Sequence, residues 1–262
     1  MRRVVPFVAA LLLLAPLGLT VWLAFSPDAF FSLPVQDAST RWFGLAVGDE
    51  RWRGALLRSV WMAGLSGLVA VGLALLAGLS IRQGEKPWWL PALLLPACIP
   101  HAAWAMGLLA WVGQLPGWAG VWVLVLAHAV LGVPVAFLVL RLRLDGTHHA
   151  LLATARGLGA GPVAAWWRVG LPRLVPALAV GFLLAGTLAL HEPVLGLFLC
   201  PPGGETLAAL AWPTLRSSLT PVVAAVATLT LVMGLGVAGA VVWLWGLERR
   251  RGRGPDGRVA GD

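Results

Sequence analysis

Long apolar runs separated by short polar segments dominate this chain. No Asp, Glu, Lys or Arg occurs in residues 4–25, 59–81, 87–140, 174–190 and 221–247. A helix rises about 1.5 Å per residue, so about 20 apolar residues cross the hydrocarbon core of a membrane. The third run is long enough for two helices and is divided by the turn-rich segment 113–120. We therefore predict six transmembrane helices, near residues 4–25, 59–81, 88–111, 120–140, 174–191 and 221–247.

The composition agrees with an all-α, polytopic membrane protein. Of the 262 residues, 59% are hydrophobic and 11% are charged, whereas a soluble domain carries about 25% charged residues. A β-barrel would show alternating segments of about ten residues, and this sequence lacks them. Arg2 and Arg3 precede the first apolar run as in a signal peptide, but its 22 residues exceed the about 7–15 of a signal peptide. We expect a retained first helix.

The basic residues predict the orientation of the chain. If the N-terminus is cytoplasmic, 14 of the 19 basic residues fall in cytoplasmic segments and 5 fall outside. The positive-inside rule then places both termini in the cytoplasm. The net charge of +8 needs no nucleic acid to explain it, since a basic tail anchors the topology beside anionic lipid. We expect three parts: 1–58, the first helix and an outside loop; 59–250, the core with five helices; and 251–262, a disordered basic cytoplasmic tail.

A polar segment between the fourth and fifth predicted helices, residues 142–173, has its own helical pattern. Leu151, Leu152, Ala155 and Leu158 recur at the spacing of one helical face, and Gly159 is suited to a left-handed helix stop. Pro162 fits the first turn of a second helix, which carries Val163, Trp166 and Trp167 and ends at Gly170 and Pro172. The apolar faces must be buried, either on the protein's own bundle or on a partner.

This segment resembles the cytoplasmic loop of ABC-importer permeases. That loop reads Glu-Ala-Ala, three residues, Gly, and later Leu-Pro with a second Pro four residues on. The matching residues are Ala155, Arg156, Leu158, Gly159, Ala160, Pro162, Leu171, Pro172 and Pro176. The resemblance implies a coupling helix that inserts into a groove of a separate ATPase and transmits its motion to the membrane helices.

The loop departs from the family pattern at three positions. The family has Glu where this chain has Ala153, often an acid where it has Leu152, and Ala where it has Thr154. The missing carboxylate removes one hydrogen-bond and charge partner from the expected contact. Either the companion ATPase has adapted, or a second permease makes the stronger contact.

Other segments narrow the resemblance to one branch. Residues 32–63, 128–144 and 190–212 are similar to the second permease of spermidine/putrescine importers. The resemblance implies a bacterial inner-membrane permease subunit for polyamines, while related branches carry ferric iron, thiamine or phosphonate. It also implies three partners: an ATPase dimer that holds ATP and Mg, a second permease in a heterodimer, and a periplasmic or lipid-anchored binding protein.

The sequence carries no signature of catalysis, so we expect that the chain is not an enzyme and holds no cofactor. It lacks a GxxxxGK[ST] phosphate loop, and "HEPVL" at 191–195 is not the HExxH zinc motif. A passive channel is one alternative class. Another is a membrane-embedded metalloenzyme that would use His101, His128, His191 and Glu192.

The same four residues are the candidates for a substrate path or a contact with the binding protein. His101 and His128 lie inside predicted helices, where ionisable groups are costly and face the bundle interior. Each either lines the path or is a neutral histidine bonded to a helix carbonyl. Glu192 follows a run of 17 apolar residues, which predicts a place near the outer interface. There it would meet a cationic substrate, contact the binding protein or be solvated. His191 stands where the resembling branch often has an acid.

Overall fold

Every regular element in the described part of the chain is a helix, which confirms the all-α prediction there. The structure, a computed structural model, describes residues 4–30, 37–81, 87–144, 146–218 and 220–252. The elements are α1 (Val4–Ala24), α2 (Arg41–Gly48), α3 (Glu50–Ser80), α4 (Leu90–Leu94), the 3₁₀ helix η1 (Leu95–Cys98), α5 (His101–Val112), α6 (Ala119–Arg141), α7 (Gly146–Gly157), α8 (Pro162–Ala165), the π helix η2 (Trp166–Gly170), α9 (Leu171–His191), α10 (Val194–Leu199), α11 (Leu207–Ser218) and α12 (Pro221–Gly252).

Four helical segments of the described chain are long and apolar enough to cross a membrane: Glu50–Ser80, Ala119–Arg141, Pro162–His191 and Pro221–Trp243. They correspond to the second, fourth, fifth and sixth predicted helices. The pair α4–η1 and α5 adds a fifth span if a bent pair counts as one. In the first predicted helix, Leu14–Ala24 forms a shorter apolar helix. The protein is therefore multi-pass, and the count of six remains a prediction.

The third predicted helix, 88–111, is wrong as a continuous helix. The axis turns by 98° between Leu90–Cys98 and His101–Val112, and Ile99 has an extended backbone (φ −85°, ψ 130°). Proline explains the break, because Pro96 and Pro100 donate no backbone hydrogen bond and a proline disfavours the helical conformation of the residue before it. As a result, His101 becomes the first residue of α5.

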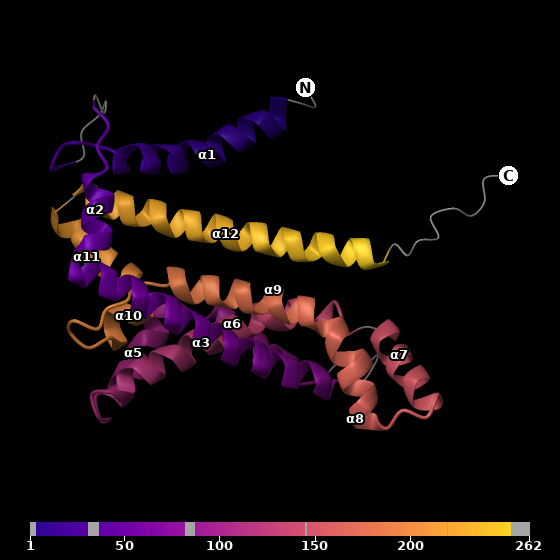
Figure 1. Cartoon of the computed structure of the whole chain (residues 1–262). Helices are drawn as coiled ribbons and strands as arrows, with labels where there is room; N and C mark the ends of the chain where they lie inside the picture. The colour runs from indigo at the N-terminus through magenta and orange to yellow at the C-terminus, as the bar shows by residue number, and fades with distance from the viewer. Residues whose placement is uncertain (1–3, 31–36, 82–86, 145, 219, 253–262) are drawn as a thin grey trace.

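The central bundle consists of α3, α6 and α9, which pack on one another along most of their length (Figure 1). Small residues let the backbones approach closely. A Cβ added to Gly67 of α3 would lie 2.9 Å from the carbonyl oxygen of Phe182 in α9, and one added to Gly132 of α6 would lie 2.8 Å from the Cβ of Ala185. Gly67 and Gly132 therefore serve close helix contacts within this subunit.

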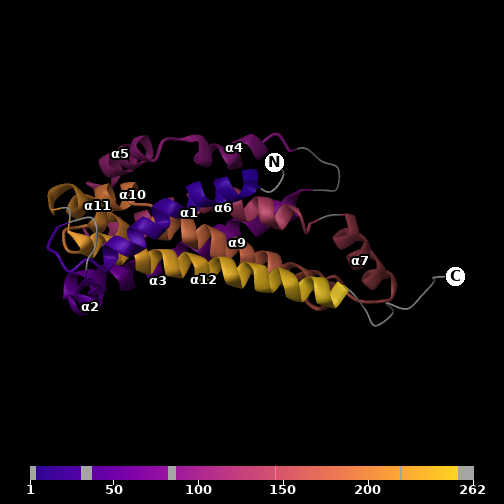
Figure 2. The same cartoon turned by 90° about the horizontal axis from the view of Figure 1, so that it is seen from above.

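The remaining helices are arranged around the two ends of the bundle. α1 packs along α12, and the N-terminal end of α1 and the C-terminal end of α12 point toward the end of the bundle where α7 lies, whereas α2, α10 and α11 gather at the opposite end (Figures 1 and 2). The N-terminal end of α3 is capped by Asp49, whose side chain accepts hydrogen bonds from the backbone nitrogens of Arg51 and Trp52. Because α3 begins at Glu50, it extends nine residues beyond the predicted start at 59.

Two glycines of α3 provide a matched test of the close packing. In Gly67→Ala, the added methyl group meets backbone atoms of α9, so we expect about 1–3 kcal/mol of destabilisation. Gly72 has no atom within 4 Å of an added Cβ, so Gly72→Ala should gain up to about 1 kcal/mol from helix propensity. Thermal unfolding in detergent measures both, and equal melting temperatures for the two variants would contradict the packing account.

Candidate functional site

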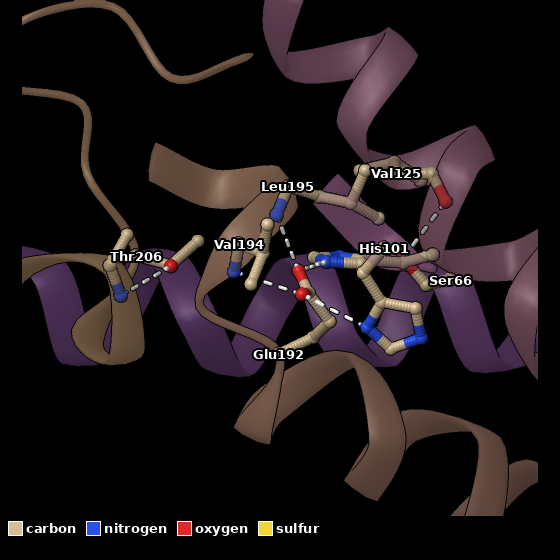
Figure 3. Close-up of polar contacts among 9 residues, drawn as sticks. Ser66, His101, Val125, Glu192, Val194, Leu195 and Thr206 are labelled. Carbon is tan, nitrogen blue, oxygen red and sulfur yellow. Dashed lines mark hydrogen bonds and ion pairs between the residues drawn. The ribbon is translucent and has the colours of Figure 1, made fainter. Parts of the chain in front are cut away.

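Glu192 lies at the junction between α9 and α10, where its carboxylate accepts two backbone hydrogen bonds (Figure 3). The nitrogen of Val194 lies 2.8 Å from Oε1, and that of Leu195 lies 2.7 Å from Oε2. Both nitrogens belong to the first turn of α10, where backbone N–H groups have no partner within the helix. The side chain thus caps α10 from outside the helix.

Two histidines from other helices bind the same carboxylate. Nδ1 of His101, at the start of α5, lies 3.2 Å from Oε1, and Nε2 of His128, within α6, lies 3.4 Å from Oε2. The side chains of Glu192 and His128 are 5% and 2% exposed, while that of His101 is 46% exposed. One carboxylate therefore connects α5, α6 and the α9–α10 junction, and we call these three residues the Glu192 cluster.

A cavity of about 240 Å³ adjoins the Glu192 cluster, and all three of its residues line the cavity. The rest of the wall is apolar: Ala97, Leu131, Val135, Leu188 and Ala189. An apolar cavity with a few converging polar groups is the usual form of a small-molecule site. The geometry therefore provides one negatively charged group at the edge of an apolar chamber.

The structure brings together three of the four predicted path residues. His191 is separate: its Nδ1 lies 2.9 Å from the carbonyl oxygen of Thr187 in its own helix, and its side chain is exposed. For His101 and His128, the predicted alternative of a bond to a helix carbonyl is wrong, since both side chains pair with the carboxylate of Glu192. A solvated Glu192 is also wrong, because the side chain is buried. Glu192 lies beside His128, the tenth residue of α6, which is about 14 Å along that helix from its first residue.

The sequence carried a partial signal for this arrangement. Pro96 and Pro100 are a signal from which the break could have been predicted, although the helix predicted over 88–111 is continuous. The apolar residues of the cavity wall, in contrast, have no feature in the sequence that distinguishes them from lipid-facing residues. For the metalloenzyme alternative, the described part of the chain contains no group of three or more His, Cys, Asp or Glu side chains that could hold a metal ion. That alternative therefore receives no support.

The predicted loop helix is present as α7, and its stop follows the expected chemistry. Gly159 has φ +91°, the left-handed conformation that glycine adopts without strain. The nitrogen of Ala160 bonds the oxygen of Ala155 at 3.1 Å, and that of Gly159 bonds the oxygen of Arg156 at 3.0 Å. These two bonds form a Schellman motif, which turns the chain toward Pro162 at the start of α8.

The second loop helix differs from the prediction because it does not end at Gly170 and Pro172. α8 passes through the π-helical turn η2 directly into α9, so that Pro162–His191 is one helical segment. Gly170 instead allows α7 to approach: an added Cβ would lie 2.8 Å from the Trp166 ring and 3.1 Å from the Leu152 side chain. Proline at position 172 fits because it lies in the first turn of α9.

The two apolar faces of the loop are divided between the interior and the surface. Leu152, Ala155 and Trp166 are half-buried where α7 meets η2. Four apolar side chains remain exposed and form what we call the outer loop surface: Leu151, Leu158, Val163 and Trp167. Leu158 is 85% exposed. Self-packing thus accounts for one face and leaves the other exposed among the residues that the structure describes.

The remaining motif residues lie around this surface. Arg156, Gly159 and Pro162 are exposed, as are Ala153 and Thr154 at the positions that depart from the family pattern. The Thr154 hydroxyl donates to the carbonyl of Ala150 in its own helix at 2.9 Å. The later motif residues, Leu171, Pro172 and Pro176, lie in the first turns of α9.

The family model described as binding-protein-dependent transport system inner membrane component matches residues 70–250. The chain belongs to this family. It is a multi-pass permease subunit of a binding-protein-dependent transporter, and the match includes the Glu192 cluster, α7 and the outer loop surface.

Curated relatives extend the likeness over most of the permease. This chain is 28% identical over 215 residues to the putrescine transport system permease protein PotI of Escherichia coli, and the alignment covers 78% of this chain and 76% of that protein. It is 27% identical over 240 residues to the spermidine/putrescine transport system permease protein PotC of Haemophilus influenzae, covering 90% of this chain and 93% of that protein. The predicted resemblance to polyamine permeases is confirmed.

Replacing Glu192 tests its part in joining the helices. Glu192→Ala leaves two backbone N–H groups and two buried or half-buried histidines without their acceptor, so we expect a loss of about 2–4 kcal/mol of stability. His191→Ala, one residue away and bonded only within α9, should change stability by less than about 0.5 kcal/mol. Chemical unfolding of the detergent-purified permease compares them, and a Glu192→Ala variant as stable as His191→Ala contradicts the assignment.

Proposed function

We propose that the permease forms half of the translocation pathway of a bacterial ABC importer for polyamines such as spermidine and putrescine. The observation that carries the substrate class is the likeness to PotI and PotC over most of their length. The site adds support, since polyamines are linear amines with protonated nitrogens and apolar methylene segments. An apolar chamber bordered by one carboxylate is complementary to both features.

The alternative substrates fit the same chamber less well. Ferric iron is a hard cation that prefers several oxygen ligands, and Glu192 is the one carboxylate among the described residues of the cavity wall. Phosphonate is an anion and would be repelled by that carboxylate. Thiamine is a cation with an aromatic body, and it remains the alternative that substrate competition must test.

The coupling role is part of the same proposal. The outer loop surface offers apolar side chains on the polar end of the bundle, and exposed Arg156 and Arg168 flank it. Burial of such a surface on a partner is favourable by about 25 cal/mol per Å². The proposed partner is the ATPase dimer, which binds ATP and Mg and hydrolyses ATP, so this chain is not itself the enzyme.

The complete importer would contain two further proteins. A second permease would supply the other half of the pathway, and a periplasmic or lipid-anchored binding protein would deliver the solute at the end of the bundle that holds α2, α10 and α11. This arrangement requires both termini and α7 on the cytoplasmic side. The excess of basic residues in those segments supports that orientation.

Uptake of labelled putrescine and spermidine tests the substrate class. Cells that lack the gene should lose uptake, and the wild-type gene should restore it. Thiamine, ferric citrate and methylphosphonate serve as competitors and should leave uptake unchanged. Normal polyamine uptake in the deletion strain, with expression of this transporter established and other polyamine carriers deleted, would exclude polyamines as the substrate.

Charge on the outer loop surface should break coupling without unfolding the permease. Leu158→Asp places a carboxylate at the centre of the proposed contact, and we expect loss of ATPase co-purification together with at least about tenfold slower uptake. Trp118→Asp is the control, because Trp118 is similarly exposed (70%) but precedes α6, at the opposite end of that helix from the loop. If both variants retain the ATPase equally, this surface is not the contact.

A further inference from the structure

We propose that the cavity beside Glu192 binds a linear alkylammonium group, and that His101 occupies the place of this group when the site is empty. The entering ammonium would displace His101 from Oε1 of Glu192. The proposal rests on the proposed function for its substrate class, and it adds a specific site, a displaced residue and a consequence for α5.

The charge of the site comes from Glu192 alone. It is the only Asp or Glu between Asp145 and Glu205 in the sequence, and it lies within the helical bundle. A carboxylate buried among apolar helices is costly, and its presence there is a reason to expect a function. Among the described residues that line the cavity, Glu192 is the acidic group that a cation entering the apolar chamber would meet.

His128 holds the other oxygen of the carboxylate in place. Its Nε2 faces Oε2 of Glu192, and its side chain is 2% exposed within α6. His128 therefore stays at Oε2 while the ligand takes Oε1. An ammonium has three N–H donors and can bond the freed Oε1 of Glu192.

His101 is the member of the cluster that can be displaced. The two backbone N–H groups on Glu192 belong to the first turn of α10, and His128 is 2% exposed within α6. His101, in contrast, is 46% exposed and is the first residue of α5, directly after the 98° break. Its ring can therefore leave Oε1 without a change in the central bundle, and Oε1 becomes available to a ligand.

The size and wall of the cavity suit an apolar chain. One water needs about 10–15 Å³ of such a cavity, so about 240 Å³ leaves room for a small organic group. The apolar wall of the cavity includes Leu131, Val135 and Leu188. These side chains suit methylene groups and offer no donor to an anion. One arm of a diamine fits this combination of an ammonium and an alkyl chain.

Displacement of His101 would also change how α5 is held. The His101–Glu192 bond connects the first residue of α5 to the α9–α10 junction, and α5 otherwise packs mainly on α10. A ligand that replaces this bond therefore loosens the start of α5, while the ligand itself remains attached to the bundle through Glu192. Ligand binding is therefore coupled to movement of the broken helix pair, α4–η1 and α5, through Oε1 of Glu192.

The test compares ligand affinity among variants of the full permease in lipid nanodiscs. Putrescine and butylamine are titrated by calorimetry, with 1,4-butanediol as the uncharged control. If His101 competes with the ligand, His101→Ala and His101→Phe should bind both amines about threefold or more tightly than wild type. Glu192→Gln should weaken binding by about tenfold or more. His191→Ala should bind as wild type does, because it lies outside the cavity.

The opposite result for His101 overturns the proposal. If His101→Ala and His101→Phe bind amines more weakly than wild type, His101 is a ligand of the amine. If they bind amines as strongly as wild type, His101 is a purely structural residue. Failure of wild type to bind either amine, or equal binding of 1,4-butanediol, also overturns it. If Glu192→Gln does not fold, the two His101 variants decide by themselves. Putrescine uptake by cells tests the proposed function separately. If cells take up putrescine through this transporter but the binding test is negative, the proposed site is wrong and the proposed function still holds.

Discussion

A carboxylate buried among apolar helices must have its hydrogen bonds satisfied by the protein, and this requirement organises the centre of the permease. Glu192 meets it with two backbone N–H groups of α10 and the rings of His101 and His128. Since the donors come from separate helices, the requirement fixes how α5, α6 and the α9–α10 junction lie relative to one another. The same contacts place a negative charge at the wall of a cavity.

Glycine and proline determine which parts of the bundle are rigid. Gly67 and Gly132 allow α3, α6 and α9 to pack at backbone distance, where van der Waals contact takes the place of the hydrophobic effect that lipid does not supply. Proline has the opposite effect at Pro100, where the helix path breaks and His101 is left at a helix start. The cavity thus lies between a tightly packed bundle and a broken helix, an arrangement that suits a pathway that must open.

The loop between α6 and α9 shows how one amphipathic pattern serves two contacts. Its apolar positions divide into a face that packs at the α7–η2 contact, around Leu152 and Trp166, and an outer face with Leu158 and Trp167. The pattern in the sequence predicted the helix, its stop at Gly159 and the need for burial. It could not assign residues to the two faces, because the continuation of α8 into α9 through η2 sets their direction.

The sequence by itself determined the properties that follow from local composition: an all-helical, multi-pass chain, the helix stop at Gly159, and the family, which a run of motif residues identifies. It also selected His101, His128 and Glu192 as unusual, since ionisable groups in apolar runs are costly wherever the chain folds. Only the tertiary structure decided that these three meet and that His191 does not. These contacts join residues 64 and 91 positions apart, so they depend on how separate helices pack. The prolines mark the break before His101, but the spacing of the residues does not say which helix the start of α5 meets.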